Sequence, residues 1–173
     1  MDHLLTAVRL AEPRCGTVRV VAVDGGAAAG KSTLAGRLAA ALPGSAVLHL
    51  DDLLDGWSGQ FDYADRLRGE VLEPLAGGRP ARYRRYDWQA GRFGAPVELA
   101  VPRHLVVEGV SALWGCAPYW SVGVFLDVPR GTRERRWAER DGPVQPEWTA
   151  WLDAEDRFFA EHPVPPAAIV LAG

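Results

Sequence analysis

The clearest chemical motif in this sequence lies near its N-terminus, where a run of small residues leads into Lys31 and Ser32. Residues 25–33 read Gly-Gly-Ala-Ala-Ala-Gly-Lys-Ser-Thr and match the pattern G-x-x-x-x-G-K-[ST]. Small residues let backbone N–H groups surround a phosphate, a lysine at this place can reach the terminal phosphates, and the serine hydroxyl can ligate Mg²⁺. The alternative is a strand-to-helix turn that holds no phosphate. The predicted nucleotide-binding residues are Gly25, Gly26, Ala27, Ala28, Ala29, Gly30, Lys31, Ser32 and Thr33.

Carboxylates stand at the ends of two further apolar runs. Asp51 and Asp52 follow residues 46–50, and Glu108 ends residues 104–108. Because ligands of open α/β sheets bind beyond the carboxyl ends of the strands, we expect these side chains beside the phosphate-binding loop. The aspartates could accept a proton from a hydroxyl or ligate Mg²⁺, and Glu108 could hold a metal-bound water. Simple capping of a helix or turn is the alternative.

An arginine-rich segment follows the fourth apolar run. Arg133, Arg136 and Arg140 are spaced by three and four residues, so they share one face of a predicted helix. Guanidinium groups are planar, permanently charged and able to bind a transferring phosphate through two bonds. We therefore expect residues from about 130 to 145 to form a lid. The alternative is a solvated helix with Glu–Arg pairs, which we favour for Arg135.

The elements that must position these groups alternate between apolar runs and helical patterns. We predict strands at residues 17–23, 46–50, 104–108, 122–127 and 168–171, and helices at 2–12, 31–42, 63–76, 131–140 and 147–162. The segment of about 77–101 carries Gly and Pro without a helical period, which predicts a loop with a small hairpin. This order indicates a three-layer α/β/α fold with a mainly parallel five-stranded sheet. The length of 173 residues favours a single domain, 1–173.

Composition narrows the class of protein. A hydrophobic content of 48% with 24% charged residues is that of a globular protein, and the net charge of −3 argues against nucleic acid as a main partner. Cys15 and Cys116 lack metal-ligand spacing and are expected to be unpaired thiols. No apolar run reaches membrane-spanning length, and the N-terminal segment is too polar for a secretory signal. We expect a cytoplasmic protein without a membrane partner. Whether it forms a homo-oligomer is left open.

Taken in order, these motifs resemble the uridine kinase and phosphoribulokinase-like P-loop kinases, a family that includes bacterial pantothenate kinase. The resemblance is carried by residues 23–33, 49–54, 61–65, 86–88, 107–110 and 133–140, and these span most of the chain. The phosphate-binding loop is specific to a superfamily. The ordered Phe-Asp, Tyr-Asp-aromatic and Glu-Gly segments between the loop and the arginines are more specific to this family.

The resemblance implies ATP and Mg²⁺ as cofactors and a role for each matching residue. Asp51 corresponds to the catalytic base, and Asp62 corresponds to a ligand of substrate hydroxyls. Tyr86 and Trp88 correspond to aromatic residues of the substrate pocket. The residues expected to act on the transferred phosphate are Lys31, Arg136 and Arg140, and the expected metal ligands are Ser32, Asp52 and Glu108.

Seven tryptophans are many for a chain of this length. Trp57 and Trp88 follow strand ends or lie in the insertion, where an aromatic face could stack on a base or sugar, or could pack against the protein. Ordinary core and rim packing is our prediction for Trp114, Trp120, Trp148 and Trp151.

The expected function is transfer of the γ-phosphoryl group of ATP to a hydroxyl of a small, nucleoside-like molecule. Uridine kinases carry a base-reading histidine after the Tyr-Asp-aromatic segment, whereas this sequence has Gly91 there, so the resemblance does not specify a pyrimidine. Two alternatives stay open. One is a kinase for another hydroxylated metabolite, such as a vitamin, sugar or antibiotic, and the other is a nucleotide-binding regulator without an acceptor.

Overall fold

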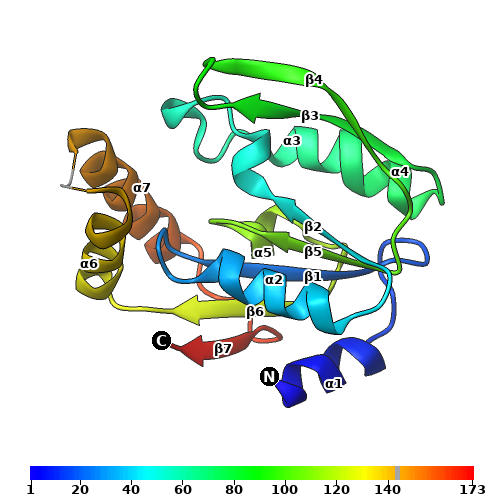
Figure 1. Cartoon of the computed structure of the whole chain (residues 1–173). Helices are drawn as coiled ribbons and strands as arrows, with labels where there is room; N and C mark the ends of the chain where they lie inside the picture. Colours follow the sequence, from blue (N-terminus) through cyan, green and yellow to red (C-terminus); the bar gives the residue numbers. More distant parts are fainter. Residues whose placement is uncertain (143–144) are drawn as a thin grey trace.

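A five-stranded parallel sheet forms the centre of the molecule in the computed structural model, which describes residues 1–142 and 145–173 (Figure 1). In spatial order the strands are β2 (Ser45–His49), β5 (His104–Glu108), β1 (Arg19–Gly25), β6 (Trp120–Asp127) and β7 (Ile169–Ala172). Every neighbouring pair runs parallel. The predicted mainly parallel five-stranded α/β fold is therefore confirmed.

Alternating side chains of the strands enter two separate cores, because helices cover both faces of the sheet. Val21 and Val23 pack with α1 (Asp2–Leu10) and α2 (Lys31–Ala41). Val20 packs on the opposite face with the other helical segments. Strands buried on both faces read as continuous apolar runs, which is why they could be recognised in the sequence.

The predicted helix over 63–76 is present but is not regular. It begins as α3 (Ala64–Arg66), widens into a π-helical turn over Leu67–Leu72, and ends as α4 (Glu73–Ala76). Pro74 has no N–H to donate and its ring crowds the preceding turn, so a standard helix cannot continue through it unchanged. A further short helix, α5 (Ala112–Gly115), follows β5 and was not predicted.

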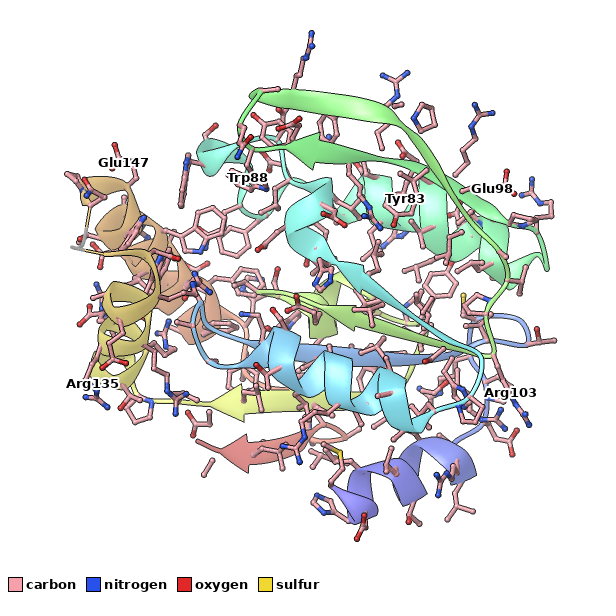
Figure 2. The ribbon with its side chains drawn as sticks, viewed as in Figure 1. Tyr83, Trp88, Glu98, Arg103, Arg135 and Glu147 are labelled. Atoms are coloured by element: carbon pink, nitrogen blue, oxygen red, sulfur yellow. The ribbon has the colours of Figure 1, made fainter. Side chains whose placement is uncertain are left out.

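The insertion forms an antiparallel hairpin of its own, as predicted. Strands β3 (Ala81–Asp87) and β4 (Arg92–Leu99) pair with each other and lie outside the central sheet (Figure 1). Tyr83 is buried and points from β3 toward the helical segment beneath it (Figure 2). With Tyr83 packed in this way, the turn that contains Trp88 lies at the end of the hairpin nearest the carboxyl edge of the sheet.

Two helices pack together beyond the carboxyl ends of the strands. They are α6 (Arg130–Asp141) and α7 (Pro146–Glu161), and the stacked rings of Trp137 and Trp148, with centroids 4.9 Å apart, join them. Arg135 projects outward from α6 into solvent, as expected (Figure 2). Helix α6 occupies most of the predicted lid of about 130–145, of which residues 143 and 144 lie outside the described residues. Nowhere in the described chain is a helix both long and apolar enough to cross a membrane.

Candidate active site

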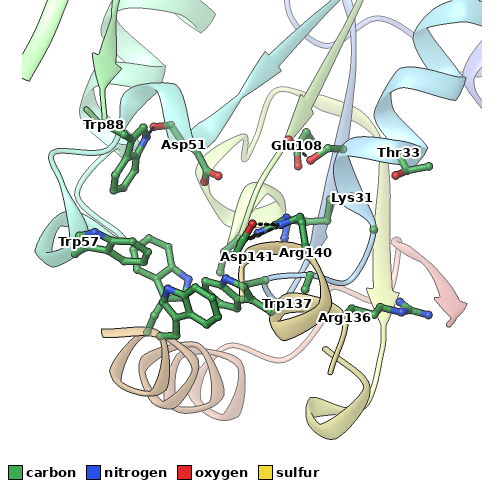
Figure 3. Close-up of a pocket in the computed structure, with 17 residues that line it drawn as sticks. Lys31, Thr33, Asp51, Trp57, Trp88, Glu108, Arg136, Trp137, Arg140 and Asp141 are labelled. Carbon is green, nitrogen blue, oxygen red and sulfur yellow. Dashed lines mark hydrogen bonds and ion pairs between the residues drawn. The ribbon is translucent and has the colours of Figure 1, made fainter. Parts of the chain in front are cut away.

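A cavity of about 690 Å³ opens at the carboxyl ends of the strands (Figure 3). Strand register places Glu108 at its floor, because this residue pairs with Val23 of β1 on one side and with His49 of β2 on the other. The loop after β1 and the turn after β2 therefore meet around Glu108. Both predicted phosphate-binding and proton-accepting segments lie at this edge.

The loop between β1 and α2 has the backbone of an anion-binding turn. Gly25 and Gly30 have φ values of 137° and 100°, which glycine adopts freely, whereas Ala28 has a φ of 60° and carries a cost of about 1 kcal/mol. Helix α2 starts at Lys31 with no side-chain cap for the N–H groups of its first turn, and its first residues, Lys31, Ser32 and Thr33, line the cavity. The Lys31 ammonium is buried and donates to the Gly26 carbonyl at 2.8 Å.

Ser32 and Glu108 come together as an oxygen pair on the cavity wall. The Ser32 hydroxyl donates to Glu108 Oε1 at 2.9 Å, and His49 Nδ1 lies 2.5 Å from the same oxygen. Mg²⁺ prefers oxygen ligands and in kinases uses one or two carboxylates together with substrate phosphates. The chemistry of this pair fits Mg²⁺, which would neutralise charge on a bound phosphate group.

Asp51 projects into the same cavity from a 3-10 turn over Leu50–Leu53, directly after β2 (Figure 3). Burial within the cavity wall raises the pKa of its carboxyl, and the neighbouring Glu108 raises it further, whereas Lys31 and His49 oppose the shift. A carboxylate with a raised pKa is a stronger proton acceptor than an ordinary aspartate. The carboxylate therefore shares the cavity with Lys31 and Ser32 of the predicted phosphate-binding loop.

Asp52 turns away from this group of residues. Its carboxylate pairs with the Arg85 guanidinium of the hairpin at 3.2 Å, and it is not among the residues that line the cavity. Ser32 and Glu108 are thus together without Asp52, which we leave out of the proposed metal site.

Tryptophans form the wall opposite the phosphate-binding loop. The ring of Trp57 meets the edges of Trp88 and Trp151, with centroids 5.5 Å and 5.4 Å away. Trp137 and Trp148 complete the wall. Trp148 and Trp151 are largely buried, as predicted, but they also line the cavity, which was not predicted. Because they are three residues apart on one helix, they lie on the same helix face, and this spacing could have indicated a shared position.

Two residues expected in the substrate pocket lie elsewhere. Tyr86 packs edge-to-face against Trp88, with centroids 5.2 Å apart, and supports this ring without lining the cavity itself. Asp62 is exposed and is not a lining residue. It also does not cap α3, whose first residue is preceded by Tyr63 and receives no hydrogen bond from a capping side chain.

The three arginines that were expected on one face of α6 have two different environments. Arg136 and Arg140 line the cavity, with Arg136 Nη1 3.5 Å from the Ala29 carbonyl and Arg140 paired to Asp141 at 2.6 Å. Arg133 is instead buried and pairs with Glu155 of α7 at 2.8 Å. Nothing in the sequence distinguishes Glu155 from the other acidic residues of its helix, so its contact with Arg133 could not be predicted.

The fold of this chain is similar to that of several solved protein structures. No protein-family model and no curated protein sequence matches the chain. Its fold is similar to that of a possible uridine kinase from Bacillus stearothermophilus, with a TM-score of 0.71 and 21% identity over 98% of this chain and 96% of that chain. It is also similar to a protein provisionally assigned as a fructose transport system kinase from Silicibacter sp. TM1040, with a TM-score of 0.68 and 21% identity over 98% and 97% of the two chains.

A gluconokinase from Sinorhizobium meliloti 1021 is a more distant neighbour, with a TM-score of 0.55 and 16% identity over 92% of this chain and 83% of that chain. At these identities the likeness concerns the fold, and one such fold carries several substrate specificities. The chain therefore shares its fold with a possible uridine kinase, as the order of its motifs predicted, and also with the protein assigned to fructose transport.

Proposed function

We propose that this protein is an ATP-dependent kinase that transfers the γ-phosphoryl group to a hydroxyl of a nucleoside-like acceptor. The observation that carries the proposal is that Lys31, Asp51 and the exposed rings of Trp57 and Trp88 line one and the same cavity. A regulator without an acceptor needs the first of these features but has no use for the other two.

The phosphate end of the cavity supplies charge and N–H groups. Lys31, the first turn of α2 and the arginines Arg136 and Arg140 would bind the nucleotide phosphates and stabilise the charge of the transition state. Ser32 and Glu108 would hold Mg²⁺. Phosphoryl transfer needs mainly positioning and electrostatic stabilisation, and these groups provide both.

Asp51 stands between the phosphate-binding loop and the tryptophan wall (Figure 3). An acceptor held against the wall would present its hydroxyl to this carboxylate, which takes the proton as the oxygen attacks the γ-phosphorus. The raised pKa of Asp51 suits the role, because a base works best with a pKa closer to the operating pH.

The tryptophan wall favours an acceptor with a planar ring. Trp57 is 48% exposed and Trp88 is 40% exposed, so both present aromatic surface at the cavity. Indole faces stack well on a planar base, at about 0.5–1.5 kcal/mol beyond the burial of area. A linear polyol would bury many hydroxyls against this wall, and each buried hydroxyl needs a hydrogen-bond partner.

Release of ADP in the presence of Mg·ATP tests the proposal when nucleosides and linear polyols are supplied in parallel. The proposal predicts release that depends on at least one nucleoside and is at least tenfold slower with every polyol. Slow release that ignores all acceptors would instead identify a regulator. Release that depends only on a polyol would identify a sugar kinase.

A further inference from the structure

A buried acidic side chain from α7 reaches the phosphate-binding loop. Glu155 has no solvent exposure, and both of its carboxylate oxygens lie 3.0 Å from the backbone nitrogen of Ala27. The same carboxylate accepts hydrogen bonds from the Trp151 indole N–H and from the Arg133 guanidinium, each at 2.8 Å. Donors from the loop, from α7 and from α6 therefore converge on one carboxylate.

The Arg133 side chain packs closely against Gly26, the residue before Ala27. A side-chain carbon added to Gly26 would lie 2.3 Å from Arg133 Nη1, so the guanidinium fills the space that a larger residue would need. The other guanidinium nitrogens bond to the Val128 carbonyl at 3.2 Å and to Asp156 at 3.3 Å. The loop is thus held by a buried ion pair whose two members come from different helices.

The charges around this pair favour its ionised form. Burial raises the pKa of the Glu155 carboxyl, and Lys31, Arg133 and the hydrogen bonds from Ala27 and Trp151 oppose this rise only in part. A hydrogen bond to a charged acceptor is about twice as strong as one between neutral groups. The Ala27 N–H therefore has a stronger partner than an ordinary loop amide.

The place of this hydrogen bond matters because of the backbone beside it. Ala27 immediately precedes Ala28, whose φ of 60° is unfavourable for a residue with a side chain. Such a conformation persists only when the surrounding structure fixes it. The bond to Glu155 fixes the Gly26–Ala27 peptide, one residue before the strained position.

We propose that Glu155 is a positioning residue that, together with Arg133, holds the phosphate-binding loop in the shape required for nucleotide and joins it to the lid helix α6. The inference rests on the nucleotide-binding part of the proposed function and is independent of the acceptor. Arg130 strengthens the same connection, because it pairs with Asp153 and Asp156 of α7 at 2.7 Å and 2.6 Å. Helices α6 and α7 are thereby tied to each other and to the loop.

Calorimetric binding of Mg·ADP, measured beside thermal unfolding, separates positioning from general stability. Glu155→Gln should raise the Kd of Mg·ADP about ten- to hundredfold. The neutral amide of glutamine lacks the negative charge that strengthens the hydrogen bonds from the Ala27 N–H and the Arg133 guanidinium. Removing one partner of a buried ion pair also destabilises the fold, so the double variant Glu155→Gln/Arg133→Met removes both charges. It should regain most of the melting temperature. Its Kd should stay at least tenfold above that of the wild type.

Glu161→Gln is the matched control. It makes the same change at an exposed residue of α7 that lies away from the loop, and its Kd should remain within about twofold of the wild type. A double variant that binds Mg·ADP within twofold of the wild type would overturn the proposal, since Glu155 would then serve stability alone.

Amide hydrogen exchange on the wild-type protein gives a test that does not depend on folding of the variants. The Ala27 amide should exchange at least tenfold more slowly than an unprotected amide, because its donor is occupied by a buried carboxylate. Exchange at the unprotected rate would contradict the proposal. Failure of the proposed function would show differently, as a wild-type protein that does not bind Mg·ADP.

Discussion

Trp88 donates its indole N–H to the backbone carbonyl of Asp51, with 3.3 Å between nitrogen and oxygen. The inserted hairpin is thereby bonded to the 3-10 turn that carries the candidate base, and one wall of the cavity is fixed relative to that base (Figure 3). A change in the hairpin should therefore affect the acceptor before it affects the nucleotide.

Trp88→Phe tests this connection directly. The variant loses the hydrogen bond to Asp51 and part of the aromatic surface, so kcat/KM for the acceptor should fall about tenfold while the KM of ATP stays unchanged. Trp120→Phe is the matched control, because the Trp120 indole donates in the same way to the Leu113 carbonyl at 3.0 Å but does not line the cavity. It should cost about 1 kcal/mol of stability and leave the acceptor kinetics alone. Equal effects of the two variants on the acceptor would contradict the account.

Lys31 offers an unusually specific test, because it is the only lysine in the chain. Lys31→Ala should lower kcat by about 10²-fold or more through loss of charge at the terminal phosphates. The melting temperature should change little, since the side chain faces the cavity and not a core. An amine-reactive ATP analogue should label Lys31 and the N-terminal amine alone, with Mg·ATP protecting Lys31. Labelling of Lys31 that ATP does not prevent would refute a role at the phosphates.

Asp51 and Asp52 can be separated by parallel variants. Asp51→Asn should lower kcat by about 10²- to 10⁴-fold with nearly unchanged affinity for Mg·ATP, the usual effect of losing a general base. Asp52→Asn should stay within a few-fold of the wild type, because its carboxylate pairs with Arg85 and not with the cavity. The reverse pattern would assign the base to Asp52, and lost Mg·ATP binding in Asp51→Asn would assign Asp51 to the metal.

The raised pKa of Asp51 also predicts the shape of the pH–rate profile. The base must be ionised to accept a proton, so kcat falls as the pH decreases through the pKa of Asp51. Because burial raises this pKa, the fall should begin at a higher pH than the pKa of an ordinary aspartate would give. Rates of the wild type measured under saturating Mg·ATP report this limb, and a profile that is flat down to the ordinary aspartate range would speak against Asp51.

Ala28→Gly tests the strain in the phosphate-binding loop. At a φ of 60° glycine avoids the side-chain clash, so the free energy of unfolding should rise by about 1 kcal/mol. Ala29→Gly, at a neighbouring position without a positive φ, should have no such benefit. Urea unfolding of both variants measures the difference, and a less stable Ala28→Gly would show that the loop does not carry this strain.

The sequence was sufficient for the features that depend on local pattern. The buried parallel strands appear as continuous apolar runs. The loop that ends at Lys31 is recognisable because its tight backbone requires small residues, glycine above all. Asp51 and Glu108 could be placed at one edge of the sheet because the carboxyl ends of parallel strands meet there.

The features that depend on packing between distant segments could not be predicted. Glu155 is one acidic residue of an acidic helix, and only the packing of α7 against the loop shows that it bonds to Ala27. Likewise the hairpin brings Arg85 to Asp52, which removes this carboxylate from the expected metal site. Pairings of this kind are set by tertiary geometry, and no local pattern encodes them.

Transfer of an isotopic label tests most directly whether this cavity moves a phosphoryl group from ATP to a nucleoside-like hydroxyl. ATP labelled in its γ-phosphoryl group is incubated with Mg²⁺, the wild-type protein and a mixture of nucleosides, and the products are separated and identified by mass spectrometry. We expect a labelled nucleoside monophosphate, formed by the wild type and reduced at least 10²-fold in Asp51→Asn. Label found only in inorganic phosphate, or equal transfer by both proteins, would contradict this expectation.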